Sequence, residues 1–148
     1  MKFWDSSAVV PLLVPEGARG AIRRVYRADP AVVAWWRTEI ECVSATVRRQ
    51  RLGGLGSPVA AGAFIRLDAL RDAWHEIEPG QEVREPAKRF LRVHDLRAAD
   101  ALQLAAAFFA AEGRPSTLEF VCLDARLSEA ARREGFVLTP VAGSRSCH

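Results

Sequence analysis

The chain has 148 residues, of which 49% are hydrophobic and 26% charged, and its formal net charge is +3. These values are typical of one soluble globular domain, and the mild positive charge permits a nucleic-acid partner without arguing for one. The three cysteines are odd in number and widely spaced, which argues against a disulfide framework or a zinc site. Asp5 and Pro11 interrupt the N-terminal apolar residues, and no apolar run approaches the roughly 20 residues of a membrane helix. We therefore expect a cytoplasmic protein that does not contact membranes.

Apolar runs too short for helices alternate with stretches of helical periodicity along the chain. In chain order they predict a strand at 2–4, a helix capped by Ser6 or Ser7, a helix at 18–27, a strand at 31–36, helices at 38–51 and 59–73, a strand at 75–78, helices at 82–93 and 96–111, a strand at 119–123, a helix at 124–134 and a strand at 136–139. Strands separated by helices favour a parallel sheet with helices on both faces. We expect one α/β domain over residues 1–141, followed by a tail at 142–148.

Two of the predicted helices carry patterns that specify which side is buried. In the helix at 38–51, Ile40, Val43 and Val47 form one apolar stripe, which predicts the buried face. The helix at 96–111 is apolar nearly all round, which predicts a position in the middle of the fold. Asp100 and Gln103 lie three residues apart on that helix and share one polar strip, which we expect to face a pocket.

Four acidic residues stand where predicted strands give way to predicted helices, namely Asp5, Glu41, Asp100 and Asp124. In a parallel α/β sheet these junctions lie along one edge, outside the carboxyl ends of the strands, so the four side chains are expected to converge. Converging carboxylates repel one another unless a cation neutralises them. The pattern therefore predicts a divalent-metal site, and such sites commonly serve phosphoryl transfer or phosphodiester cleavage.

Each acid also has a structural explanation. Asp5 suits a turn at a strand end, Asp124 suits the N-cap of its helix, and Glu41 completes a capping box that begins at Thr38. Asp100 lies where the helix dipole favours negative charge, but it fits this explanation worst, because an ionised carboxylate on a buried helix is costly without a partner. Caps and metal ligands at strand ends point into the same crevice, so both explanations stay open.

Each of the four acids lies in a longer motif. The motifs are FWDSSAVV at 3–10, TEIECVSA at 38–45, LRAADALQLA at 96–105 and FVCLDARLSEAA at 120–131, the last followed by Gly135 and Phe136. In this order they resemble the motifs of PIN-domain proteins, in particular the VapC-type toxins of bacterial toxin–antitoxin pairs. The resemblance covers residues 2 to about 140.

The resemblance implies a three-layer α/β/α fold with a central parallel sheet and a Mg²⁺- or Mn²⁺-dependent endoribonuclease that cleaves RNA. It also implies a homodimer that a small cognate antitoxin protein inhibits. Carried over by position, Asp5, Glu41, Asp100 and Asp124 become the catalytic and metal-binding acids, with Ser6 as a neighbouring polar contact. We expect Asp5 and Asp100 to bind the principal ion directly, and Glu41 and Asp124 to bind through water or to hold a second ion.

Two positions depart from the family pattern. Gln103 stands where many relatives have histidine, and Cys122 stands where many have threonine or serine. Neither change removes a carboxylate, but Cys122 lacks a hydroxyl that could order the surroundings of Asp124, which makes Asp124 the least secure of the four acids.

Other functions find less support in the sequence. It contains no nucleophile elbow, phosphate-binding loop or dinucleotide fingerprint. A phospho-acceptor signalling domain would need a lysine in its pocket, and the only lysines are Lys2 and Lys88. The remaining alternative is a PIN-like module that binds RNA or a protein without cutting.

Basic and aromatic residues offer candidate contacts for RNA or for an antitoxin. The basic ones are Arg48, Arg49 and Arg51 on one helix, and Lys88, Arg89 and Arg92 on another. The aromatic ones are Trp35, Trp36 and Trp74. Arginines can follow an RNA backbone, although solvated helix faces explain the basic residues equally well. Tryptophans can stack on bases or receive a helix, but ordinary core packing is the favoured explanation for these three.

Overall fold

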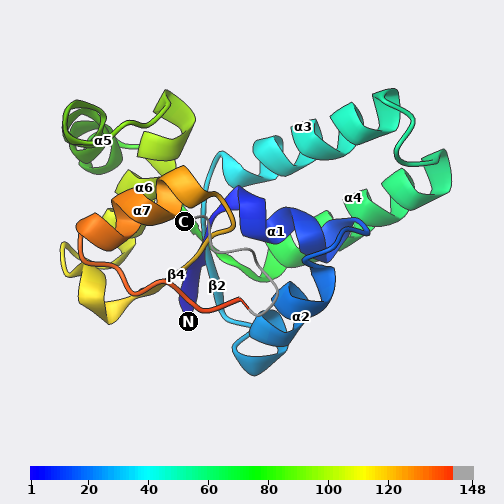
Figure 1. The fold of residues 1–148 in the computed structure, drawn as a ribbon, viewed down its shortest axis with the longest axis horizontal. Coiled ribbons are helices and arrows are strands. Elements are labelled where there is room, and N and C mark those ends of the chain that lie inside the picture. The colour runs from blue at the N-terminus through cyan, green and yellow to red at the C-terminus, as the bar shows by residue number, and fades with distance from the viewer. Residues whose placement is uncertain (142–148) are drawn as a thin grey trace.

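The computed structural model describes residues 1–141, so the predicted tail at 142–148 lies outside the described residues. The described part contains one four-stranded sheet in the order β3-β2-β1-β4, and every pair of neighbouring strands is parallel. The strands are β1 (Lys2–Trp4), β2 (Val32–Trp35), β3 (His75–Ile77) and β4 (Glu119–Val121). Figure 1 shows this sheet between two groups of helices.

Seven α-helices accompany the sheet within residues 1–141. They are α1 (Ser6–Leu13), α2 (Arg19–Ala28), α3 (Thr38–Arg51), α4 (Ser57–Ala73), α5 (Gln81–Val93), α6 (Ala98–Ala110) and α7 (Ala125–Arg133). The first four cover one face of the sheet, and α5, α6 and α7 cover the other (Figure 1). None of the described helices is both long and apolar enough to cross a membrane.

Alternating residues of each strand divide the apolar side chains between two cores. On β1, Phe3 packs with α5, α6 and α7, whereas Trp4 packs with the helices on the opposite face. Val33 and Val32 on β2 divide in the same way. A parallel sheet with both faces buried needs apolar residues at consecutive positions, which explains the short uninterrupted apolar runs of this chain. The predicted three-layer α/β/α architecture is confirmed.

Two features of the sequence prediction are wrong. The last strand, expected at 136–139, is only a single parallel bridge between Leu138 and Phe120, and Pro140 has no N–H group with which to extend the pairing. The stripe expected to be buried on α3 faces solvent, because Ile40 is 53% and Val43 is 37% exposed. The buried side of α3 consists instead of smaller residues such as Cys42, and these allow close packing against α1 and α4.

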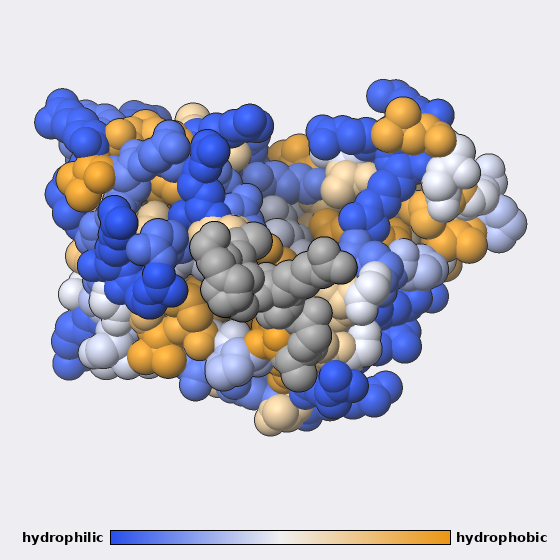
Figure 2. All heavy atoms as spheres, viewed as in Figure 1, coloured by the Kyte–Doolittle hydropathy of each residue, from blue (hydrophilic) through white to orange (hydrophobic). Residues whose placement is uncertain are grey.

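The hairpin formed by α3 and α4 extends away from the sheet (Figure 1). Its turn contains Gly53, whose φ of +80° is a conformation that side chains disfavour. Figure 2 shows hydrophobic residues gathered at the far end of this hairpin, where Leu52 is 80% exposed. The N-terminus of α3, by contrast, lies beside the carboxyl edge of the sheet, directly after β2.

Candidate active site

Asp5 lies at the carboxyl end of β1, in the centre of the sheet. Its backbone N–H donates to the carbonyl of Val121 on β4, 3.0 Å away, and its side chain is almost fully buried, with the residue 4% exposed. Asp5 is itself the N-cap of α1, so the expectation that Ser6 or Ser7 caps this helix is wrong. Its Oδ2 accepts hydrogen bonds from the N–H of Ser7 at 3.1 Å and from the Ser7 hydroxyl at 2.5 Å. The polar neighbour of Asp5 is therefore Ser7, not Ser6.

Cys122 connects Asp5 to the loop that carries Asp124. Its sulfur lies 3.6 Å from Asp5 Oδ2 and 3.4 Å from the backbone oxygen of Asp124. The Ser7 hydroxyl accepts a hydrogen bond from the N–H of Leu123 at 2.9 Å, which ties α1 to the same loop. Burial, reinforced by the charge of Asp5, raises the pKa of Cys122, so this cysteine stays a neutral thiol. The thiol thus acts as a weak donor toward the carboxylate.

Glu41 is held from α6. Gln103 donates through Nε2 to Glu41 Oε1 at 2.6 Å and to the Thr38 hydroxyl at 3.0 Å. The polar strip on α6 therefore faces the site, as expected. The capping box expected between Thr38 and Glu41 is wrong, because the N-cap of α3 is Arg37 and no side chain caps this helix. The amide oxygen of Gln103, Oε1, is buried and has no hydrogen-bond partner among the described residues.

Asp100 and Asp124 complete the carboxyl edge. Asp124 is the N-cap of α7, and its Oδ1 accepts a hydrogen bond from the N–H of Leu127 at 3.0 Å, as its structural explanation predicted. Asp100 lies half-buried in the first turn of α6. Because α6 follows α5, the expectation that Asp100 stands after a strand is wrong. Arg97 and Arg126 lie near enough to favour its charged form, although burial outweighs them.

The four carboxylates share one electrostatic environment. Burial raises the pKa of Asp5, and the charges of Asp100 and Asp124 raise it further, against the bonds from Ser7. Burial also raises the pKa of Glu41, to about 7, with repulsion from Asp5 and Asp100 added. Asp100 has a raised pKa because of burial and the charge of Asp124. Asp100 and Asp124 therefore act on Asp5, and Asp5 and Asp100 act on Glu41, while the arginines that favour the charged forms of Glu41 and Asp100 do not outweigh burial.

These residues fit a hard divalent cation in chemistry but do not form a finished coordination shell. Among residues 1–141 no group of three or more Asp, Glu, His or Cys side chains is arranged to hold a metal ion as it stands. The donors at the site are carboxylate oxygens, which Mg²⁺ and Mn²⁺ prefer. The unpartnered Oε1 of Gln103 is a further oxygen beside Glu41. A cation at this edge would relieve the repulsion that raises the pKa values.

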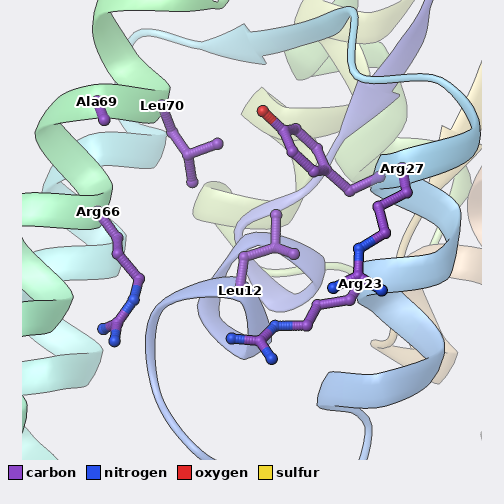
Figure 3. A pocket seen from close by; sticks show the side chains of 7 residues that line it. Leu12, Arg23, Arg27, Arg66, Ala69 and Leu70 are labelled. Atoms are coloured by element: carbon purple, nitrogen blue, oxygen red, sulfur yellow. The ribbon is translucent and has the colours of Figure 1, made fainter.

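A cavity whose lining includes none of the four acids lies between α1, α2 and α4. It has a volume of about 450 Å³, and its lining includes Leu12, Leu70 and three arginines. Figure 3 shows Arg23 on α2 and Arg66 on α4 reaching toward the opening from opposite sides, with Leu12 between them. Arg66 Nη1 donates to the backbone oxygen of Leu13 at 3.0 Å.

The positive charge of this cavity is uncompensated. Arg23 and Arg27 form no ion pair with any other described residue. Burial, followed by repulsion from Arg23 and Arg66, holds the pKa of the adjacent Arg19 below its usual value. This cavity, which we call the arginine pocket, therefore suits a ligand with negative charge and an apolar body.

Burial distinguishes the three tryptophans that the sequence offered as candidate contacts. Trp35 and Trp74 are buried in the two cores, which confirms their packing role. Trp36 is 44% exposed and stays a candidate for contact with a ligand.

No protein-family model matches this sequence, and no curated protein matches it. Among solved structures, the sarcin–ricin-loop-cleaving toxin VapC20 of Mycobacterium tuberculosis superposes with a TM-score of 0.68 at 23% identity, over 94% of this chain and 98% of that one. FitAcB from Neisseria gonorrhoeae gives 0.66 at 15% identity, over 95% and 98%. A toxin–antitoxin complex from Klebsiella pneumoniae gives 0.60 at 16% identity, over 85% and 88%. The chain thus has the PIN-like fold that its motifs predicted.

Removing the buried charge of Asp5 should stabilise the ion-free protein. Asparagine caps helices as well as aspartate, so Asp5→Asn keeps the start of α1 but loses the costly charge. Because the pKa of Asp5 is raised on folding, the parent loses stability as pH rises from the unfolded pKa through the folded one, and Asp5→Asn does not. In chelator at pH 8 we expect a higher melting temperature for Asp5→Asn, by roughly 2–4 °C for each 1 kcal/mol of relieved cost.

The difference should vanish at acidic pH, where the parent carboxyl is also neutral, and the exposed control Asp68→Asn should change little at any pH. A lower melting temperature for Asp5→Asn at every pH would show that the bonds from Ser7 outweigh burial and repulsion.

Proposed function

We propose that the protein is the toxin of a toxin–antitoxin pair and a divalent-metal-dependent endoribonuclease that cleaves RNA phosphodiester bonds. The observation that carries this proposal is the group of four acids at the carboxyl edge of a PIN-like sheet, where burial and the charges of neighbouring acids raise the pKa of Asp5, Glu41 and Asp100. A neighbour of the same fold is a toxin that cleaves the sarcin–ricin loop. Repulsion among buried carboxylates destabilises a protein, so its presence at one spot favours a site that a cation completes.

The residues of the site would have different roles in binding the ion. Asp5 and Asp100 would hold Mg²⁺ or Mn²⁺ directly, with Glu41 and Asp124 acting through water or on a second ion. The bound ion supplies Lewis acidity toward a phosphate oxygen and an acidified water. Ser7 fixes the orientation of the Asp5 carboxylate through two hydrogen bonds.

Glu41 is suited to proton transfer as well as to binding. Gln103 occupies its Oε1, which leaves Oε2 free to take a proton from an attacking water. In the ion-free protein burial raises the pKa of Glu41 to about 7. A cation at the site would lower this pKa, so Glu41 would be ionised and able to accept a proton as a general base. The proton that Glu41 takes would then pass to solvent, and a water would protonate the leaving ribose oxygen.

The arginine pocket is our proposed docking site for an acidic, apolar segment of the antitoxin. Arg23, Arg27 and Arg66 would pair with carboxylates, while Leu12 and Leu70 would receive apolar side chains. Leu12 lies seven residues after Asp5, on the helix that Asp5 caps, a rise of about 10 Å. An antitoxin anchored there lies within reach of the acidic edge. The homodimer and the cytoplasmic location stay predictions of the resemblance.

The activity is tested on RNA with Mg²⁺ or Mn²⁺ added. Asp100→Asn keeps the shape of the side chain but removes the charge, and we expect cleavage to fall at least about 100-fold, the usual cost of losing one member of an electrostatic site. Chelator should abolish cleavage by the parent, and Asp68→Asn, an exposed aspartate on α4, should cut like the parent.

An Asp100→Asn protein that cuts as well as the parent would end this assignment. RNA binding without cleavage, indifferent to metal and chelator, would favour the alternative of a non-catalytic PIN-like binding module.

The antitoxin site is tested by reversing charge in the arginine pocket. Replacing Arg23 and Arg27 together by glutamate should weaken binding of the cognate antitoxin at least tenfold, because like charges then face each other across the contact. Isothermal titration calorimetry measures this, and Arg92→Glu on α5 is the control, with expected parental affinity. Equal affinities for the two variants would rule out the pocket as the docking site.

A further inference from the structure

Three of the six basic residues that the sequence offered for RNA already form ion pairs. Arg49 pairs with Glu16 at 2.6 Å, and Lys88 and Arg89 each pair with a glutamate. Arg48, the neighbour of Arg49 in sequence, is exposed and forms no ion pair with any residue of the described part. Of these two adjacent arginines, Arg49 is therefore bound to Glu16, and Arg48 is available to bind a ligand.

Arg48 lines a cavity that it shares with Glu41 of the acidic site. This cavity of about 330 Å³ is lined by Arg37, Ile40, Glu41, Ser44, Ala45 and Arg48. All six belong to α3 or to its N-cap position. Positions 37, 41, 44 and 48 follow the spacing of one helix face. We call Arg37, Glu41, Ser44 and Arg48 the α3 strip.

The α3 strip places a positive charge on either side of the acid. At 1.5 Å of rise per residue, Arg37 lies about 6 Å from Glu41 along the helix axis, and Arg48 about 10 Å in the other direction. Arg37 is close enough to favour the charged form of Glu41. It is exposed, and like Arg48 it has no ion pair among residues 1–141. Each guanidinium is free to bind an anion.

The groups between and beside the two arginines suit a nucleic-acid strand. The Ser44 hydroxyl is exposed and can donate to a phosphate oxygen. Ile40 opens into the same cavity and offers an apolar contact to a ribose or a base. The exposed Trp36 next to Arg37 offers a face on which a base can stack. Alternating cationic and apolar groups along one face match a polyanion that carries flat rings.

We propose that the α3 strip is the binding track for the RNA substrate, with Arg37 and Arg48 each holding a phosphate of the strand on opposite sides of Glu41. This inference rests on the proposed ribonuclease function and adds to it the direction in which the substrate lies. The strand follows the axis of α3, so the two arginines set which phosphodiester reaches the acidic edge.

The test is the salt dependence of RNA binding, measured by fluorescence anisotropy with a labelled single-stranded RNA in chelator. Each phosphate contact contributes about 0.7 to the slope of log K against log salt concentration for single strands. Arg37→Ala and Arg48→Ala should each lower that slope by about 0.7, and the double variant by about 1.4. Both residues are exposed and unpaired, so the variants should fold, which circular dichroism checks.

Arg49→Ala is the matched control, because it removes the same charge from the same helix but from a residue that is bound to Glu16. Its slope should equal that of the parent. An unchanged slope in Arg37→Ala and Arg48→Ala, or an equal loss in Arg49→Ala, overturns the track. A parent protein that does not bind RNA overturns it as well.

Cleavage of the same RNA with Mn²⁺ separates this inference from the proposed function. If the parent cleaves RNA but the variants keep the parental slope, the proposed track is wrong and the proposed ribonuclease function stands. If binding depends on Arg37 and Arg48 but no cleavage occurs, the track stands and the ribonuclease function is wrong.

Discussion

The gathering of one buried and three partly buried carboxylates at the carboxyl edge of the sheet is the constraint on which the rest of the site depends. The parallel pairing of β1 with β4 brings Asp5 beside the loop that carries Asp124, through the bond from the Asp5 N–H to Val121. Helices α3 and α6 then add Glu41 and Asp100. Among residues 1–141, Arg37, Arg97 and Arg126 favour the charged forms of Glu41 and Asp100, but burial outweighs them and raises the pKa of three of the four acids. Proteins retain such local instability mainly where function needs it.

Neutral donors, not arginines, hold the acids in place. Ser7 and Cys122 fix Asp5, and Gln103 fixes Glu41. A direct ion pair at these positions would compete with a divalent cation for the same oxygens, whereas a hydroxyl, a thiol and an amide orient the carboxylates and leave their charge available. The free arginines lie farther out, in the α3 strip and in the arginine pocket. The described residues thus include the acidic site, the α3 strip and the arginine pocket, for which we propose a metal ion, an RNA strand and an antitoxin segment.

Much of the fold could be predicted from the sequence, because its signals are local. Short apolar runs predicted every strand of the sheet, and helical periodicity predicted every helix. The strand–helix junctions located Asp5, Glu41 and Asp124, whereas Asp100 lies at the start of a helix that follows another helix. The errors on α3 concern contacts between distant segments, whereas the error at the start of α1 is local. Ile40 and Val43 look like a buried stripe on α3, but neighbouring helices decide which side is covered. Glu41 has the spacing of a capping box, yet it accepts a hydrogen bond from Gln103 on a distant helix instead. The sequence analysis expected Ser6 as the polar contact of Asp5, whereas Ser7 makes that contact. The choice between two adjacent serines depends on the geometry of the helix cap.

The central claim is that the acidic edge binds a divalent cation, and the most direct measurement is a calorimetric titration of Mn²⁺ into the ion-free protein. The account predicts saturable binding by the parent, a large loss of affinity in Asp5→Asn and in Asp100→Asn, and parental affinity in Asp68→Asn. Binding that survives both site substitutions, or a parent that takes up no Mn²⁺, would contradict it.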